Sequence, residues 1–371
     1  MSSYMAADCC PTDGYCEALT RGIEIVNGVN NTTFKATPVG TLQLLFDPEN
    51  RADAEYILQD EGAVRKIRVK RLQRSTEADA QEGILCLDAE QMPYVEQCVT
   101  VSKGVTIGFE STLDEMQQYC AAYSRVATGD ISSMPFMVAH LQKIMAQMNG
   151  IREKINSIVI AEILGNIGIN VSTGSNAPVT LDMLDATTGG KLEKGIQILN
   201  HQMVENEVYG TYLISGFGIF DRFNTSMQYG CCNQWGLNWD AMNSAAPYKY
   251  YKDLKLKDMT GNPDIFLAFA PGAVQFVYYN DVLLHNRDGR RHGNTLYGVV
   301  IDPLVPGLRY DVAVEETNCN GPFRQPKWTI NMYLNFDLAF IPENAFKPGQ
   351  DRLHPPGGMS NGVFQYIAAE V

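Results

Sequence analysis

Two glycine-rich stretches come close to phosphate-binding motifs, but neither has the residues that the chemistry needs. Residues 187–192 (TTGGKL) contain a Gly-Lys pair, yet Asp185 stands where a P-loop needs glycine, and Leu192 stands where a hydroxyl must bind magnesium. Gly216 and Gly218 form a GxG pair, but no third glycine follows at the distance of the dinucleotide-binding fingerprint. The sequence therefore predicts no nucleotide cofactor.

The histidines and cysteines are not spaced for metal binding or acid–base catalysis. No two histidines stand at helical metal-binding spacing, and the odd number of cysteines includes no CxxC pair. We expect His140 to lie at the surface or at a boundary, and the cysteines to be reduced and mostly buried. The charged loop 285–293 (HNRDGRRHG) could bind an anion, although a plain exposed loop is the favoured interpretation. We predict no catalytic residue, no metal, no cofactor and no enzyme activity.

The chain of 371 residues has an ordinary globular composition and an acidic charge balance. Hydrophobic residues make up 45% of it and charged residues 19%, which suits two or three cooperating domains. The net charge of -13 argues against a general nucleic-acid binder, because phosphate binding depends on clustered lysine and arginine. No apolar run reaches transmembrane length, and the first residues lack the pattern of a signal peptide. We therefore expect the chain to stay in the cytoplasm of its host.

A long amphipathic helix is predicted over residues 134–165, with Ser132 or Ser133 as N-cap and Gly165 or Gly168 as its stop. Its apolar positions repeat at spacings of four and three, which places them on one face: Met137, Leu141, Ile144, Met148, Ile151, Ile155 and Ile158. We expect the other side to face water or another polar surface, and it carries Gln142, Lys143, Gln147, Asn149, Arg152, Glu153, Lys154 and Asn156. Because most globular helices are far shorter, an extended layer must lie beneath it.

Two strands of unusual length are predicted as that layer. Residues 328–340 alternate strictly between apolar and other residues, and residues 99–109 do so with valine, isoleucine and phenylalanine on one side. Strands usually have five or six residues. The sequence therefore predicts an α+β fold in which a long helix covers an elongated sheet.

Residues 37–97 carry their charge in acidic, basic and acidic blocks. The strand-like pattern of the basic block predicts a projecting hairpin, with residues 84–87 as the partner strand. The basic strand could contact phosphates, it could pair with acidic residues of another copy of the chain, or it could be merely solvated; pairing between copies is the favoured hypothesis. The candidate assembly residues are the basic Arg65, Lys66, Arg68, Lys70, Arg71 and Arg74, and the acidic Asp53, Glu55 and Glu61.

The remaining segments give shorter elements. Residues 111–128 predict a helix capped by Ser111 or Thr112, residues 181–199 predict a helical region broken by two glycines, and residues 209–223 predict a buried strand followed by a turn. Short strands separated by polar loops follow up to residue 321. Residues 1–36 show no sustained period and predict an extended arm.

The order of these elements resembles the major capsid protein of tailed bacteriophages, a fold shared with herpesvirus capsids and encapsulins. The resemblance implies an N-terminal arm at 1–36, an extended charged hairpin loop at 37–97 and a peripheral domain at 98–205 with a spine helix at 134–165. It further implies an axial domain at 206–325 and a C-terminal long strand at 326–371 that returns to the peripheral domain.

The resemblance also implies a function. We expect copies of the chain to self-assemble, as hexamers and pentamers, into the icosahedral head shell of a phage virion. Separate scaffolding, portal and decoration proteins would be its partners, packaged double-stranded DNA would be contacted weakly, and no membrane would be involved. Two alternatives stay open: an encapsulin-like nanocompartment shell, and a soluble enzyme without a recognisable motif.

Overall fold

The computed structural model describes residues 15–29, 39–51, 55–61, 64–72, 94–184, 193–208, 210–216, 248–318, 326–345, 353 and 358–370. Its contacts divide the chain into two compact units, each built from three separate stretches. Unit 1 contains residues 1–37, 102–155 and 278–336, and unit 2 contains residues 38–101, 156–277 and 337–371. The predicted domain at 206–325 is therefore not one unit, because its two halves pair with strands of different sheets.

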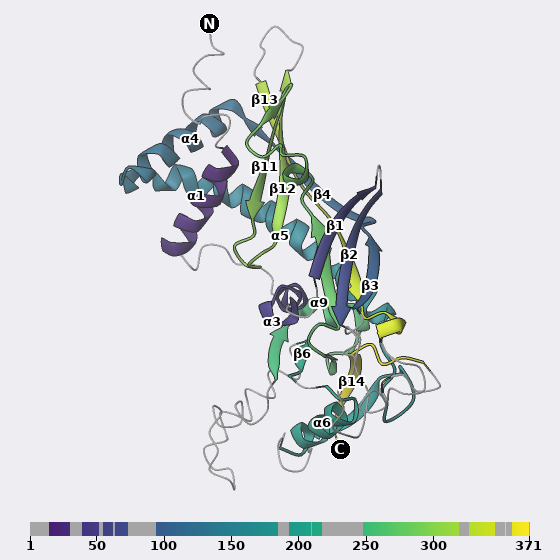
Figure 1. Ribbon diagram of the computed structural model, residues 1–371. Coiled ribbons are helices and arrows are strands. Elements are labelled where there is room, and N and C mark those ends of the chain that lie inside the picture. The colour runs from purple at the N-terminus through teal and green to yellow at the C-terminus, as the bar shows by residue number, and fades with distance from the viewer. Residues whose placement is uncertain are drawn as a thin grey trace, which may run out of the picture. The chain divides into compact units, whose positions relative to one another are not determined.

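Unit 1 contains an antiparallel sheet in the order β10-β11-β12-β13-β4 (Figure 1). Its strands are β10 (Arg291–His292), β11 (Thr295–Ile301), β12 (Arg309–Asn318), β13 (Pro326–Phe340) and β4 (Lys103–Thr112). In β13 every second side chain is buried from Ile330 through Met332 and Leu334 to Phe336. The long alternating strand is confirmed, and its buried face explains its length, since each fully buried side chain of this size stabilises the fold by about 1.5–3 kcal/mol.

The predicted strand over residues 99–109 is wrong, because the structure divides it into two strands. β3 (Tyr94–Thr100) pairs with β2 (Val64–Leu72) in unit 2, whereas β4 pairs with β13 in unit 1. The backbone N–H of Val101 still donates to Arg65 at 3.1 Å, and two residues later Lys103 stands opposite Phe336. Periodicity alone does not reveal this break, because both strands keep the same alternation.

The longer helices of unit 1 are α1, α4 and α5 (Figure 1). α4 (Leu113–Ala127) begins with a capping box in which Thr112 and Glu115 each accept a hydrogen bond from the other's backbone, so the predicted cap at 111 or 112 falls on Thr112. α5 (Met134–Gly165) has the predicted bounds, and a short 3-10 turn at Ile131–Ser133 precedes it. α1 (Tyr15–Val29) contradicts the prediction of an extended arm.

α1 is helical because its apolar residues are covered within unit 1. Leu19 and Ile23, four residues apart on one face, are both 1% exposed. The Tyr119 hydroxyl of α4 donates to the backbone oxygen of Ala18 at 2.8 Å, and a Cβ at Gly22 would lie 2.9 Å from that hydroxyl. The buried residues Ala18, Leu19 and Ile23 form only a short apolar pattern, which is a weak sequence signal, and tertiary contacts supply the rest.

α5 is buried on more of its circumference than its apolar pattern predicts. Six of the seven predicted apolar positions are buried, and Ile158 is half-buried. Arg152 and Asn156, which we placed on the water-facing side, are both 0% exposed. His140, predicted at the surface, is 4% exposed with its ring centroid 4.8 Å from that of Tyr119. These three predictions are wrong because acceptors from distant parts of the chain cover Arg152 and Asn156, and Tyr119 of α4 packs against His140.

Unit 2 contains a mixed sheet in the order β5-β14-β8-β6-β7, with an apolar core beneath helix α6 (Glu193–Glu205). The strands are β5 (Val179–Leu184), β14 (Val363–Glu370), β8 (Ile265–Phe269), β6 (Tyr212–Ser215) and β7 (Lys249–Lys252). The predicted buried strand near residue 212 is confirmed. The helical region predicted over residues 181–199 is confirmed from Glu193 on by α6, and it is wrong for residues 181–184, which run parallel to β14 as an edge strand.

Short elements complete the described part of the chain. In unit 2 these are α2 (Gly40–Leu45), α3 (Pro48–Arg51), α9 (Leu254–Thr260) and the 3-10 turn Glu343–Ala345. β9 (Val274–Tyr279) pairs with β13, and α10 (Asp281–Leu284) follows it. No described helix is long and apolar enough to cross a membrane. Cys120 is disulfide-bonded, which contradicts the prediction of reduced thiols for this residue, whereas Cys98 is a free, exposed thiol.

Candidate functional site

The basic block forms the middle strand of a three-stranded antiparallel sheet in unit 2. β2 lies between β1 (Glu55–Glu61) and β3, so both of its edges are paired and residues 84–87 are not its partner. The predicted partner segment itself lies outside the described residues. The structure places Arg65, Lys66, Arg68, Lys70 and Arg71 on β2, and Glu55 and Glu61 on β1, whereas Asp53 and Arg74 lie outside the described residues.

The two faces of β2 differ in character. Ile67 and Val69 are 4% and 0% exposed, and together with Val99 of β3 they form an apolar cluster with Val277 and Ala339. The sequence predicted a projecting hairpin, and this is wrong for the described part of the sheet. One of its faces packs on an apolar cluster that Val277 and Ala339 share. The other face carries the half-buried cations Lys66, Arg68 and Lys70.

The cations on that face have acidic neighbours within the same chain. Glu96 of β3 forms ion pairs with Arg68 at 3.1 Å and with Lys70 at 3.5 Å. In the strand register Lys70 also stands opposite Glu55 of β1. The second acidic block thus returns as the neighbouring strand and already pairs with Arg68 and Lys70 within the chain, while pairing with another copy stays a hypothesis.

Arg71 is an anchor of this sheet and not one of its exposed charges. Its side chain is buried, and its guanidinium donates to the backbone oxygens of Gly272 at 2.5 Å and Ala339 at 3.2 Å. Gly272 lies in the turn between β8 and β9, and Asn50 holds the same turn. Its side-chain amide donates to the backbone oxygen of Val274 at 3.1 Å and accepts from the backbone N–H of Gly272 at 2.9 Å. Arg71 thus fixes where the sheet is attached within unit 2, which the alternating pattern of β2 did not distinguish from the exposed positions.

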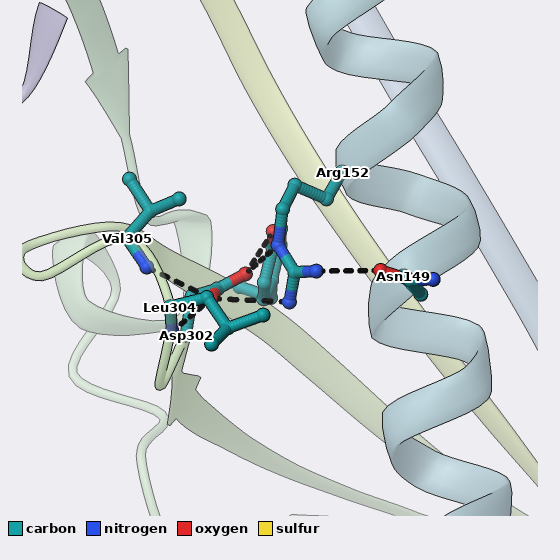
Figure 2. Close-up of polar contacts among 6 residues, drawn as sticks. Asn149, Arg152, Asp302, Leu304 and Val305 are labelled. Carbon is teal, nitrogen blue, oxygen red and sulfur yellow. Dashed lines mark hydrogen bonds and ion pairs between the residues drawn. The ribbon is translucent and has the colours of Figure 1, made fainter. Parts of the chain in front are cut away.

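A buried ion pair fastens α5 within unit 1 (Figure 2). Arg152 donates to both carboxylate oxygens of Asp302, at 2.9 and 3.1 Å, and to Asn149 at 2.7 Å. Both members of the ion pair have fully buried side chains. Such bidentate pairing is directional and leaves the guanidinium little freedom. The site was missed because sequence alone ranks arginine as an exposed residue.

Asp302 also organises the turn that follows β11. Its carboxylate accepts from the backbone N–H groups of Leu304 at 2.8 Å and Val305 at 3.1 Å, and from the Tyr310 hydroxyl at 2.7 Å. Burial, together with the adjacent carboxylate, raises the pKa of Tyr310 well above its usual value. The Asp-Pro step at 302–303 and the Pro-Gly step at 306–307 were the available sequence signals for this turn.

A second buried carboxylate performs the same task in unit 2. Asp253 is 0% exposed and accepts from the Asn156 amide at 2.9 Å, from the Thr41 hydroxyl at 2.7 Å and from the Lys255 N–H at 3.0 Å. It thereby caps α9 and joins it to α2 and to the last turns of α5. These buried charges are satisfied by partners within the fold, as structural groups are. Among the described residues, no group of three or more His, Cys, Asp or Glu side chains is placed to hold a metal ion.

The other segments that drew attention for chemistry give little to build on. Residues 187–192 and Gly218 lie outside the described residues. In loop 285–293, Arg291 pairs with Glu316 at 2.7 Å and Arg287 lies 5.6 Å from the ring centroid of Tyr297. The described functional candidates are therefore the charged sheet and the anchors that hold it.

Comparison with known proteins gives matches at the level of structure only. No protein-family model matches the sequence, and no curated protein does. A structure from Mycobacterium phage Che8 is similar over 90% of this chain and 92% of its own, at 9% identity and a TM-score of 0.40. A virus-like particle from Pyrococcus furiosus is similar over 95% of this chain and 99% of its own, at 10% identity and a TM-score of 0.40. The mature capsid of bacteriophage PhiM1 is similar over 87% of each chain, at 9% identity and 0.36.

Proposed function

We propose that this chain is a major capsid protein, many copies of which assemble into the closed icosahedral shell of a tailed phage. One observation carries the proposal: the three-stranded sheet is anchored on one face by Arg71 and an apolar cluster, and it presents a row of cations on the other. A rigidly held, charged face on an acidic chain is suited to an acidic patch on a second copy, because complementary potentials set the register of protein contacts.

The build of the rest of the chain supports the same proposal. α5 has 32 residues, a length of about 48 Å, and β13 has 15 residues. Helices and strands of this length exceed what a compact enzyme domain needs, and they suit an extended subunit that tiles a surface. In this proposal the virion is the location of the protein, and scaffolding, portal and decoration proteins are separate partners.

The first test is assembly of the purified chain. Sedimentation velocity and negative-stain microscopy should show closed shells, in the purified material or in a phage lysate that contains the chain. Small discrete particles under both conditions would overturn the proposal. The contents of the shell distinguish the alternative: an encapsulin-like compartment would contain a protein cargo, whereas a phage capsid would contain DNA.

A second test addresses the cationic face. The variant with Arg68→Gln and Lys70→Gln should fold, because each partly exposed ion pair with Glu96 contributes only about 0–1 kcal/mol, while its assembly should fail or become misdirected. The matched control carries Lys154→Gln and Lys257→Gln, the same loss of charge at exposed positions on α5 and α9. Arg71 is left intact, because its side chain is buried. If the first variant assembled like the control at low and high salt, the face would not act through its charge.

A third test addresses nucleic acid. The isolated subunit should bind duplex DNA weakly at physiological salt, since the chain is acidic overall and its basic strand is partly neutralised by Glu96. Filter binding over a salt series measures this directly. Sub-micromolar binding with a steep salt slope would instead favour a direct phosphate contact by the basic strand.

A further inference from the structure

Asp311 is a carboxyl group buried in the middle of the unit 1 sheet. It lies on β12 opposite Val299 of β11 and Tyr333 of β13, and it is 0% exposed. Its Oδ2 accepts from the backbone N–H of Asp281 at 2.6 Å, at the start of α10. Its Oδ1 is buried without a hydrogen-bond partner. An oxygen buried without a partner leaves the ionised form incompletely compensated.

The groups around Asp311 act in both directions, because hydrogen bonds from Asp281, Asn280 and Val282 lower its pKa and the Asp281 carboxylate raises it. Asp281 of α10 places a second carboxylate near Asp311, and the Nε2 atom of His285 lies 3.6 Å from an oxygen of that second carboxylate. Tyr333 of β13 stands opposite Asp311 in the strand register, and the guanidinium of Arg287 lies 5.6 Å from the ring centroid of Tyr297. Burial, reinforced by the neighbouring carboxylate of Asp281, raises the pKa of Asp311 to about 7.

α10 and the loop after it are the parts that Asp311 holds. Asn280 is linked to β12 through a hydrogen bond of its amide to Arg309 at 3.0 Å, and Arg287 N–H donates to Val282 at 2.8 Å. The contact from Asp311 to Asp281 N–H ties this segment to the sheet at its first helical residue. Opening the segment would let water reach the carboxylate, which favours the ionised form.

We propose that Asp311 is a proton-controlled latch for residues 280–287: the protonated carboxyl keeps this segment closed on the sheet, and ionisation favours its release, while residues 289–293 stay paired with β11. This goes beyond the proposed function and does not depend on it. In the open state the carboxyl has its ordinary pKa near 4, so the closed state binds the proton more tightly. Closure is therefore strongest below about pH 4, weakens as pH rises toward 7 and is constant above it.

Hydrogen exchange of the full-length chain tests the latch. Peptides covering residues 280–287 are followed from pH 5.5 to 8.5, with the intrinsic exchange rates divided out. Protection should fall by roughly tenfold to thirtyfold between pH 5.5 and 7.5, and by less than about twofold above that. Asp311→Asn should abolish this dependence. Glu110→Gln, which removes an exposed carboxylate that pairs with Lys327 away from the segment, is the matched control and should keep it.

Further variants keep the test decisive if Asp311→Asn does not fold. Asp281→Asn removes the neighbouring charge, so the fall in protection should level off at a lower pH. His285→Gln removes the histidine that lies beside Asp281 and should leave the fall in place. Protection that is independent of pH in the natural chain, or an unchanged dependence in Asp311→Asn, would overturn the proposal.

Discussion

The buried pair of Arg152 and Asp302 allows a quantitative prediction about unit 1. Replacing Arg152 by Met removes the cation but leaves Asp302 with three donors: the Tyr310 hydroxyl and the N–H groups of Leu304 and Val305. Breaking a buried pair typically costs about 3–5 kcal/mol. Because the carboxylate keeps these donors, we expect a cost near the lower end, about 3 kcal/mol.

Replacing Asp302 by Leu should cost more than replacing Arg152. It leaves a fully buried guanidinium and orphans three donors, each worth about 1–3 kcal/mol when buried without a partner. The sum exceeds about 5 kcal/mol, which is comparable to the whole stability of many domains, so we expect unit 1 to lose its fold. The double variant should lose less than the sum of the single changes, because no charge is left unpaired.

Urea unfolding at neutral pH, followed by circular dichroism, measures these differences. Lys143→Met is the matched control on the same helix: its ion pair with Glu115 is exposed and should contribute at most about 1 kcal/mol. Raising the salt concentration should weaken the control pair and leave the Arg152 effect unchanged. A cost below about 1 kcal/mol for Arg152→Met, or a smaller cost for Asp302→Leu than for Arg152→Met, would refute the reasoning.

Three further predictions concern other buried features. Burial lowers the pKa of His140 to about 4, so its contribution to the free energy of unfolding is fully present above about pH 6.5 and falls by about 3 kcal/mol toward pH 4. His140→Leu should remove this fall in acid unfolding curves, whereas His201→Gln, at an exposed histidine, should not. Gly40→Ala should lower the unfolding midpoint, because its Cβ would lie 2.3 Å from the backbone oxygen of Lys252, whereas Gly165→Ala meets open space and should not. Reduction of the Cys120 disulfide should cost about 2–4 kcal/mol, as thermal unfolding with and without reductant would show, and a non-reducing peptide map lacking a Cys120 cross-link would contradict it.

Elements with a strong local pattern were predictable from the sequence. The 32-residue helix α5 has the predicted bounds, and β13 has the predicted alternation, because both patterns repeat over many turns or pleats. The cap of α4 follows from a short motif. The Thr112 hydroxyl accepts from the Glu115 backbone N–H, and the Glu115 carboxylate accepts from the Thr112 backbone N–H. In each case the deciding interactions involve residues that are close in the sequence or that lie on one face of the same element.

The tertiary structure alone decided which polar residues are inside. Arg152, Asn156 and Arg71 look like solvated positions in their own elements, yet each is buried because acceptors arrive from segments more than ninety residues away. The same cause divides the predicted strand at residue 101, where the pairing partner changes from β2 to β13. A sequence pattern records which residues can be buried without a partner, whereas burial of a charge depends on a partner that only the folded chain brings close.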